Sequence, residues 1–252
     1  MKILLLDIET APNIAYVWEL WSKNMSIPTG QLIDSRYVLC WSAKWYHETD
    51  IMFASIHQDG EKTMIKKIHK LLQEADVVVH YNGKKFDIPA LNKEFLTNGL
   101  FPPSSYKQID LLLVAKQKFK FASNKLDYVA QTLGVGTKVR HKGFELWIEC
   151  MNNVPESWAQ MEEYNKQDIV LLEGVYIKML PWISQHPNYS LYQDNADICT
   201  NCGSAHHQRR GWAYTKAFKY PRFQCKDCGT WFRGTKKSTR EIVGTRDLIG
   251  CS

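Results

Sequence analysis

The sequence predicts an α/β fold, a mixed sheet flanked by helices, followed by a small C-terminal unit. Three strand-like segments come first and can pair antiparallel, and helices then alternate with strands, an order that favours helices packed on a mixed sheet. Two CxxC pairs mark the second unit, after a segment where hydrophobic periodicity fades. The length of 252 residues suits one medium domain and a small appendage.

The N-terminal elements follow from short apolar runs and from helical spacing. Residues 2–8 (KILLLDI) are typical of a buried strand, and residues 37–45 and 51–56 of two further strands joined by the polar turn HETD. Apolar residues recur at helical spacing over 61–73. Residues 76–81 (DVVVHY) predict another short strand.

Later elements are mostly helical. Residues 109–115 fit a strand or a helix equally well. The segment 188–197 is typical of a linker, so we expect domains at 1–187 and 198–252. Helical spacing of apolar residues, ended in two cases by a following glycine or proline, predicts helices over 89–96, 125–133 and 155–180.

Composition excludes a membrane protein and locates the positive charge. The apolar stretch Ile3–Leu6 is far shorter than the roughly 20 residues of a membrane span, so we expect a cytoplasmic protein without membrane contact. The net charge is +6, with eleven Lys or Arg against four Asp or Glu after residue 195, and 21 against 22 before it. The basic C-terminal segment fits a polyanion such as nucleic acid, or simply a solvated surface.

Three short motifs carry carboxylates. Asp7 and Glu9 alternate on the first strand and so face the same side, either as metal ligands or as two solvated acids. Asp87 ends the loop NGKKFD, where the alternative role is a helix cap. Tyr164 and Asp168 are four residues apart on one helix face, which is either a partly buried site or an exposed face.

Together the motifs are far more specific than any one alone. Phosphodiester hydrolysis with two metal ions needs clustered carboxylates, and hard oxygen ligands suit Mg²⁺ or Mn²⁺. The motifs DIET at 7–10, NGKKFD at 82–87 and YNKQD at 164–168 resemble the three exonuclease motifs of the DEDDy branch of the DnaQ-like, ribonuclease-H-fold superfamily. The resemblance extends over residues 1 to about 180 and implies an RNase H-like mixed sheet.

The resemblance also implies roles for individual residues. It makes Tyr164 the residue that orients the attacking water, and it places Thr10 and Asn82 near the 3′-terminal nucleotide. The implied ligands of two Mg²⁺ or Mn²⁺ ions are Asp7, Glu9, Asp87 and Asp168.

Three further residues near these motifs have two interpretations each. Asp110 either supports the metal site or caps the following turn. His141 and Lys142 belong to the basic loop KVRHK, which either touches the phosphate backbone or is merely solvated.

The C-terminal unit resembles a zinc ribbon. Two CxxCG segments can each form a tight knuckle, and four thiolates make a closed tetrahedral site for one structural Zn²⁺, at Cys199, Cys202, Cys225 and Cys228. Aromatic and basic residues alternate between the pairs, which favours nucleic-acid binding over docking of a protein partner. Some of the rings, among them Trp212, Phe218 and Phe223, are needed for the small core of the unit.

Several functions remain open at this point. The leading hypothesis is a 3′→5′ exonuclease acting on single-stranded DNA or frayed 3′ ends. The same site would serve an exoribonuclease that trims RNA. A non-catalytic nucleic-acid-binding or assembly factor is a third hypothesis, which clustered carboxylates facing a phosphate argue against. Endonucleolytic cutting is disfavoured by Tyr164 in the third motif.

Overall fold

The computed structural model describes residues 1–20, 26–193, 197–216 and 218–236. Residues Lys2–Tyr176 and Ile177–Ser252 form two compact units, which divide within the last long helix. The predicted domain boundaries at 187 and 198 stay predictions, and residues 237–252 of the predicted second domain lie outside the described residues. None of the helices that the structure describes combines the length and hydrophobicity that a membrane crossing requires.

The first unit is built on a five-stranded mixed sheet of order β5-β4-β1-β6-β7. Strands β1 (Ile3–Thr10), β4 (Val38–Trp45) and β5 (Met52–Ser55) pair antiparallel, as predicted. Strands β6 (Val77–His80) and β7 (Lys107–Asp110) continue parallel to β1. Strand β1 is therefore central, and its apolar residues are buried on both faces.

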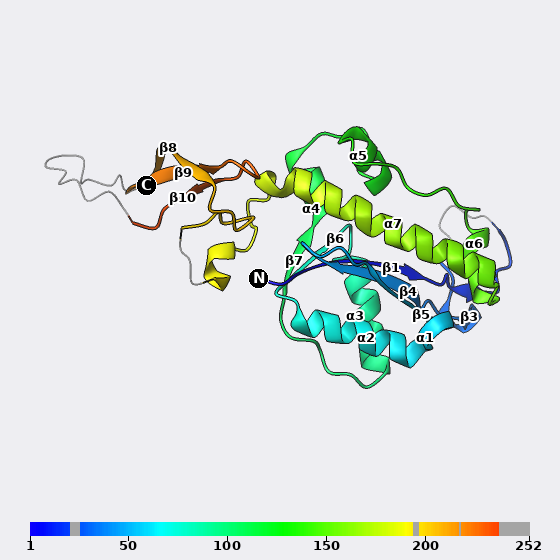
Figure 1. Cartoon of the computed structure of the whole chain (residues 1–252). Helices are drawn as coiled ribbons and strands as arrows, with labels where there is room; N and C mark the ends of the chain where they lie inside the picture. Colours follow the sequence, from blue (N-terminus) through cyan, green and yellow to red (C-terminus); the bar gives the residue numbers. More distant parts are fainter. Residues whose placement is uncertain (21–25, 194–196, 217, 237–252) are drawn as a thin grey trace, which may run out of the picture. The chain divides into compact units, whose positions relative to one another are not determined.

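Helices cover both faces of this sheet (Figure 1). On one face, α1 (Ile56–Asp59), α2 (Glu61–Glu74) and α3 (Asp87–Thr97) lie against the even-numbered side chains of β1, among them Leu4 and Leu6. On the other face, α6 (Glu145–Met151) and α7 (Pro155–Met179) pack against β4. The predicted α/β fold, a mixed sheet flanked by helices, is confirmed.

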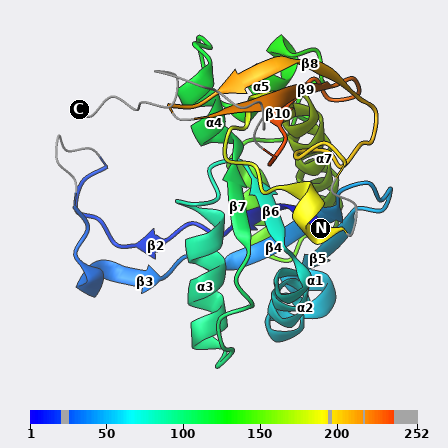
Figure 2. The same ribbon diagram turned by 90° about the vertical axis from the view of Figure 1, so that its left-hand side faces the viewer.

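The ambiguous segment 109–115 contains both kinds of structure, because β7 ends at Asp110 and α4 (Leu111–Lys118) begins at the next residue. Helix α5 (Leu126–Thr132) ends before Gly134, which has a φ of 67°. The elements β2 (Ile14–Ala15), η1 (Thr29–Gln31) and β3 (Leu32–Asp34) were not predicted, because two or three residues do not establish a period. Helix α6 was not predicted either, although α5 has the same length, because no glycine or proline marks its end as Gly134 marks that of α5. Figure 2 shows that β2 and β3 pair apart from the main sheet.

The second unit contains a three-stranded antiparallel sheet of order β10-β9-β8. Its strands are β8 (His207–Tyr214), β9 (Lys219–Cys225) and β10 (Trp231–Arg233), preceded by the short helices η2 (Leu180–Trp182) and η3 (Tyr189–Tyr192). Each CxxCG segment forms the expected tight turn. Gly203 and Gly229 have φ values of 75° and 80°, and their N–H groups donate to Cys199 and Cys225 carbonyls.

Candidate active site

Three carboxylates meet on one face of the central strand. Asp7 and Glu9 alternate along β1 and share a face, with Glu9 opposite Cys40 of β4. Helix α7 covers this face and carries Asp168 (Figure 1). One oxygen from each of the three carboxylates lies within 4.8 Å of the others. Residues 7, 9 and 168 therefore form one acidic cluster.

Asp87 stands beside this acidic cluster, with its carboxylate turned to the backbone of β1. The N-cap of α3 is Phe86 and makes no side-chain hydrogen bond, so the alternative that Asp87 serves as the cap is wrong. The Asp87 Oδ1 atom accepts a 3.2 Å hydrogen bond from the Ile8 N–H, and the side chain is buried. Because Ile8 lies between Asp7 and Glu9, this bond brings a fourth carboxylate to the cluster.

Asp110 holds the loop that leads to Asp87. It is the N-cap of α4 and accepts from the Leu112 N–H at 3.0 Å. The same carboxylate accepts from the Asn82 N–H at 2.9 Å and the Lys84 N–H at 3.4 Å. Asp110 thus caps α4, as one of the two interpretations expected, and also holds the loop of the second motif.

His80 and Gly83 fix the start of the same loop. Burial lowers the pKa of His80, which favours the neutral ring, and its Nδ1 atom accepts from the Gly83 N–H at 3.0 Å. A Cβ at Gly83 would lie 2.4 Å from the His80 ring. The loop therefore needs glycine at this position because the imidazole occupies the space.

Helix α7 turns three polar side chains toward the acidic cluster. Tyr164, Asn165 and Asp168 are all buried, so the alternative of an exposed helix face is wrong. The Asn165 Nδ2 atom donates a 2.7 Å hydrogen bond to the Asp7 Oδ2 atom. Nothing in the local sequence marks Asn165, because only the packing of α7 on β1 reveals its partner.

Lys138 is a second site residue that sequence analysis missed. Its Nζ atom donates to the Asp168 Oδ2 atom at 2.5 Å and to the Tyr164 hydroxyl at 3.0 Å. The ammonium also lies 4.9 Å from the centre of the Tyr164 ring. The basic loop KVRHK was noted in the sequence, but nothing in it distinguishes Lys138 from its basic neighbours.

His141 and Lys142, the two residues of this loop with a predicted role, make different contacts. The His141 ring packs against Tyr164 and Trp147, with centroids 4.8 and 5.2 Å apart. Lys142 forms a 3.0 Å ion pair with Glu149. His141 therefore borders the site, whereas Lys142 is held by a carboxylate of α6.

Burial and mutual repulsion raise the pKa values of the clustered carboxyl groups. Burial, followed by the charge of Asp168, raises the pKa of Glu9 to about 8, against the opposing effect of Lys138. Burial raises the pKa of Asp87 to about 7. The pKa of Asp7 is raised by burial and by its acidic neighbours, Asp168 first. The charged forms of these partly buried carboxyl groups are therefore disfavoured unless a cation lies between them.

The donor set fits a hard divalent cation. The Asp168 Oδ1 atom is buried and has no hydrogen-bond partner among the described residues. A buried oxygen without a partner is costly, and a cation would supply the missing interaction. Carboxylate oxygens are the ligands that Mg²⁺ and Mn²⁺ prefer.

We expect the protein without divalent cations to lose stability as the pH rises from about 4 to about 8. The raised pKa values mean that the folded state binds more protons than the unfolded chain in this range. The free energy of unfolding therefore falls as pH rises. Saturating Mg²⁺ should raise the melting temperature by roughly 5–10 °C at pH 8, measured against an EDTA control. A Mg²⁺ effect as large at pH 5 would contradict this assignment.

A cavity of about 420 Å³ opens beside Glu9. Thr10 lines it, next to the aromatic side chains Phe86, His141, Phe144 and Trp147. Asn82, the other residue expected near a terminal nucleotide, is not among the lining residues. Its N–H donates to Asp110, and its carbonyl accepts from the Lys85 and Phe86 N–H groups.

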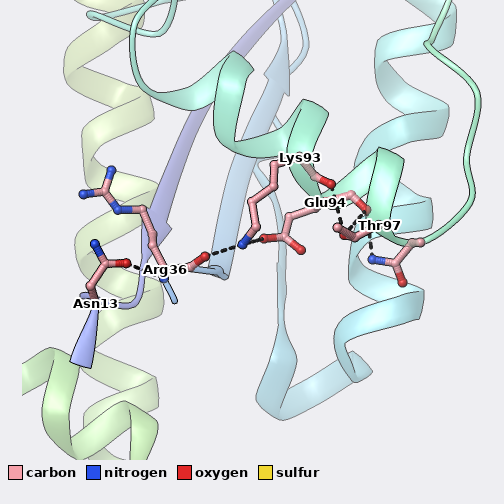
Figure 3. Close-up of polar contacts among 6 residues, drawn as sticks. Asn13, Arg36, Lys93, Glu94 and Thr97 are labelled. Atoms are coloured by element: carbon pink, nitrogen blue, oxygen red, sulfur yellow. Dashed lines mark hydrogen bonds and ion pairs between the residues drawn. The ribbon is translucent and has the colours of Figure 1, made fainter. Parts of the chain in front are cut away.

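The position of Arg36 at this cavity is fixed through its backbone (Figure 3). The Asn13 Oδ1 atom accepts from the Arg36 N–H at 2.7 Å, and the Lys93 Nζ atom donates to the Arg36 carbonyl. The guanidinium, left free of these bonds, lies 5.4 Å from the centre of the Phe86 ring. The cavity therefore presents one cation and several ring faces beside the carboxylates.

The four predicted thiol ligands converge in the second unit. The Sγ atoms of Cys199, Cys202, Cys225 and Cys228 all lie within 4.8 Å of one another. His206 contacts Asp227 at 3.0 Å, and His207 packs against Phe223. The arrangement is compatible with a zinc ribbon.

The profile of one protein family matches residues 36–180, and its description is RNase_H superfamily. This match covers more than half of the chain, and the chain belongs to the RNase H superfamily. Members of this superfamily are in general nucleases that use divalent metals and bind nucleic acid.

Among solved structures, the family B DNA polymerase from the hyperthermophilic archaeon Pyrobaculum calidifontis is similar, with a TM-score of 0.55 and 19% sequence identity. The match covers 72% of this chain and 25% of the polymerase, so the chain spans a quarter of the protein that it matches. At this identity the likeness shows the fold. No curated protein matches the chain.

Proposed function

We propose that the chain is a 3′→5′ exonuclease of the DEDDy type, which hydrolyses phosphodiester bonds of single-stranded DNA or of exposed 3′ ends. The observation that carries the proposal is the acidic cluster of Asp7, Glu9 and Asp168 within 4.8 Å, with Tyr164 one helical turn from Asp168. Asp87 completes the four carboxylates through its bond to Ile8.

The carboxylates would hold two Mg²⁺ or Mn²⁺ ions, which when bound offset charge on the phosphate and lower the pKa of water. Tyr164, one helical turn from Asp168, would orient the attacking water. Burial, and then the charge of Glu9, raises the pKa of its phenol, so at neutral pH it is a hydroxyl that donates and accepts. Lys138 adds a positive charge beside the same hydroxyl.

The cavity beside Glu9 suits the terminal nucleotide. Phe86, Phe144 and Trp147 offer rings against which a base can stack, and Arg36 offers a cation for a phosphate. Thr10 lines this cavity and follows Glu9 in the chain. A site that grips one unpaired terminal nucleotide supports stepwise removal from an end.

We expect Tyr164→Phe to lower the cleavage rate about 100-fold without unfolding the protein, since the hydroxyl that positions water is lost and the buried ring stays. The rate should be measured under single-turnover conditions with saturating Mg²⁺. Tyr128→Phe, at a partly exposed tyrosine of α5, is the matched control. Full activity of Tyr164→Phe would show that the Tyr164 hydroxyl does not orient the attacking water.

The reaction itself is tested by a time course on DNA and RNA single strands of one sequence, labelled at either end. Products of the 5′-labelled strand that shorten from the 3′ end support the proposal. Faster cleavage of DNA than of RNA supports the proposed exonuclease, and faster cleavage of RNA supports an exoribonuclease. Cleavage of a closed circle would instead support an endonuclease. If no strand is cleaved, the result would support a binding or assembly factor.

We also propose that residues 198–252 are a zinc ribbon domain in which Cys199, Cys202, Cys225 and Cys228 bind one structural Zn²⁺. The convergence of four Sγ atoms and the positive-φ glycines of both knuckles support this. The ring cluster of His207, Phe223 and Phe232 is too small to stabilise such a unit without a bound metal ion that crosslinks it.

A further inference from the structure

One face of the three-stranded sheet in the second unit combines arginines with aromatic rings. Side chains alternate along a strand, and Phe223 is opposite Phe232, so these two rings share the face that packs with His207. The opposite face carries the residues that alternate with them, and we name it the arginine face: Tyr220, Arg222, Gln224, Trp231 and Arg233.

The arginines of this face lie over its rings. The Arg222 guanidinium is 4.8 Å from the centre of the Trp231 ring, and that of Arg233 is 4.2 Å from the Tyr220 ring. Trp231 keeps 50% of its surface exposed, and both arginines are exposed. The face therefore offers ring surface and positive charge to the solvent side by side.

The charges of this face are not balanced within the sheet. Arg222 and Arg233 are directly opposite each other across β9 and β10, an arrangement that is destabilising for like charges. Among the described residues, no carboxylate forms an ion pair with either arginine. Asp227 is bound to Ser204 and His206 instead. An anionic ligand would relieve the repulsion.

The whole unit has the same sign of charge. Its described residues from 197 to 236 include eight Lys or Arg and two Asp or Glu. Arginine, tryptophan and tyrosine are also common at protein interfaces, so the excess of cations over the whole unit is the feature that favours a polyanion. Exposed rings beside cations are the features that bind unpaired bases and their phosphates.

We propose that the arginine face is a binding surface for single-stranded nucleic acid, with Arg222 and Arg233 on phosphates and Trp231 and Tyr220 against bases. This goes beyond the proposed cleavage reaction, because the surface would bind a strand whether or not the carboxylates cut it. It rests on the proposed function only for the expectation that the bound strand is also the substrate.

The test measures binding in the zinc-loaded full chain carrying Asp7→Asn, which leaves the strand uncut. The probes are fluorescein-labelled DNA and RNA single strands of roughly 16 nucleotides, the upper range of common site sizes, and the corresponding duplex. Affinity is measured by fluorescence anisotropy over a series of KCl concentrations. The variants are Arg222→Gln with Arg233→Gln, and Trp231→Leu.

We expect each variant to lose about ten-fold more affinity for the single strands than for the duplex, with its zinc content unchanged. Loss of two phosphate contacts should also reduce the slope of log affinity against log salt by about 1.4. Trp231→Phe should bind as the parent does, because it keeps a ring. For Trp231→Leu the slope of log affinity against log salt should equal that of the parent, because no phosphate contact is lost. The control Lys66→Gln with Lys70→Gln removes the same charge from exposed positions of α2 and should change affinity less.

Folded, zinc-loaded variants that bind single strands as the parent does would overturn the proposal. An effect no larger than that of the α2 control would overturn it as well, because the binding would then depend on net charge alone. Cleavage of a trinucleotide by the chain with intact Asp7 is measured in parallel. It reports on the proposed function separately, since a failure of the arginine face leaves that cleavage unchanged.

Discussion

Asp7→Asn is expected to slow cleavage at least about 1,000-fold, because it removes a charged oxygen from the acidic cluster where cations must bind. The substitution keeps the size of the side chain and an oxygen that can accept from the Asn165 Nδ2 atom. It also relieves repulsion with Glu9 and Asp168, so the variant without metal should be at least as stable as the wild type at pH 8. The measurements are single-turnover cleavage and thermal unfolding.

Asp50→Asn is the control, since it removes a carboxylate from an exposed turn outside the cluster. It should cut at the wild-type rate. Cleavage by Asp7→Asn within ten-fold of the wild type, with Mg²⁺ still raising its melting temperature, would contradict the assignment of Asp7 as a metal ligand. A loss of activity with a matching loss of folded protein would call for the same measurement on Asp168→Asn.

The second large effect is expected for Cys225→Ser, which should reduce the zinc content from about one per chain to near zero. The Cys225 Sγ atom is buried and lies 3.6 Å from the Cys202 Sγ atom, so a shorter, harder hydroxyl cannot replace it. The sheet of β8, β9 and β10 should lose its protection from hydrogen exchange. Binding of long strands should weaken, while some cleavage of short substrates remains.

Cys150→Ala is the matched control, because this buried cysteine belongs to α6 of the first unit. Zinc is measured by atomic emission on purified protein, and hydrogen exchange by mass spectrometry. Equal zinc content in Cys225→Ser and the wild type would exclude the proposed ribbon site.

Local pattern was enough to predict most of the architecture. Short apolar runs predicted four of the five strands of the main sheet, and helical spacing predicted its long helices, because burial leaves a pattern in the sequence. The fifth strand, β7, lies where the pattern fitted a strand or a helix. Alternation along a strand put Asp7 and Glu9 on one face before any tertiary contact was known. The two CxxCG segments predicted knuckles, because glycine permits the positive φ that such turns need.

Several short elements could not be predicted from local pattern. Strand β2 spans only two residues, too few to repeat a hydrophobic spacing. Helix α6 has the same length of seven residues as the predicted α5 but lacks the glycine that marks the end of α5. The segment 109–115 contains a strand end and a helix start, and only the capping bond from Leu112 to Asp110 separates them.

The amino-acid sequence by itself determined the α/β class, the carboxylate motifs and the four thiols, because each depends on residue type and near spacing. The tertiary structure alone decided that Asn165 binds Asp7, 158 residues away, and that Lys138 lies between Tyr164 and Asp168. It also decided that Arg222 and Arg233 oppose each other on an exposed face. Such contacts depend on how whole elements pack and pair, and no local period records which distant side chains will meet.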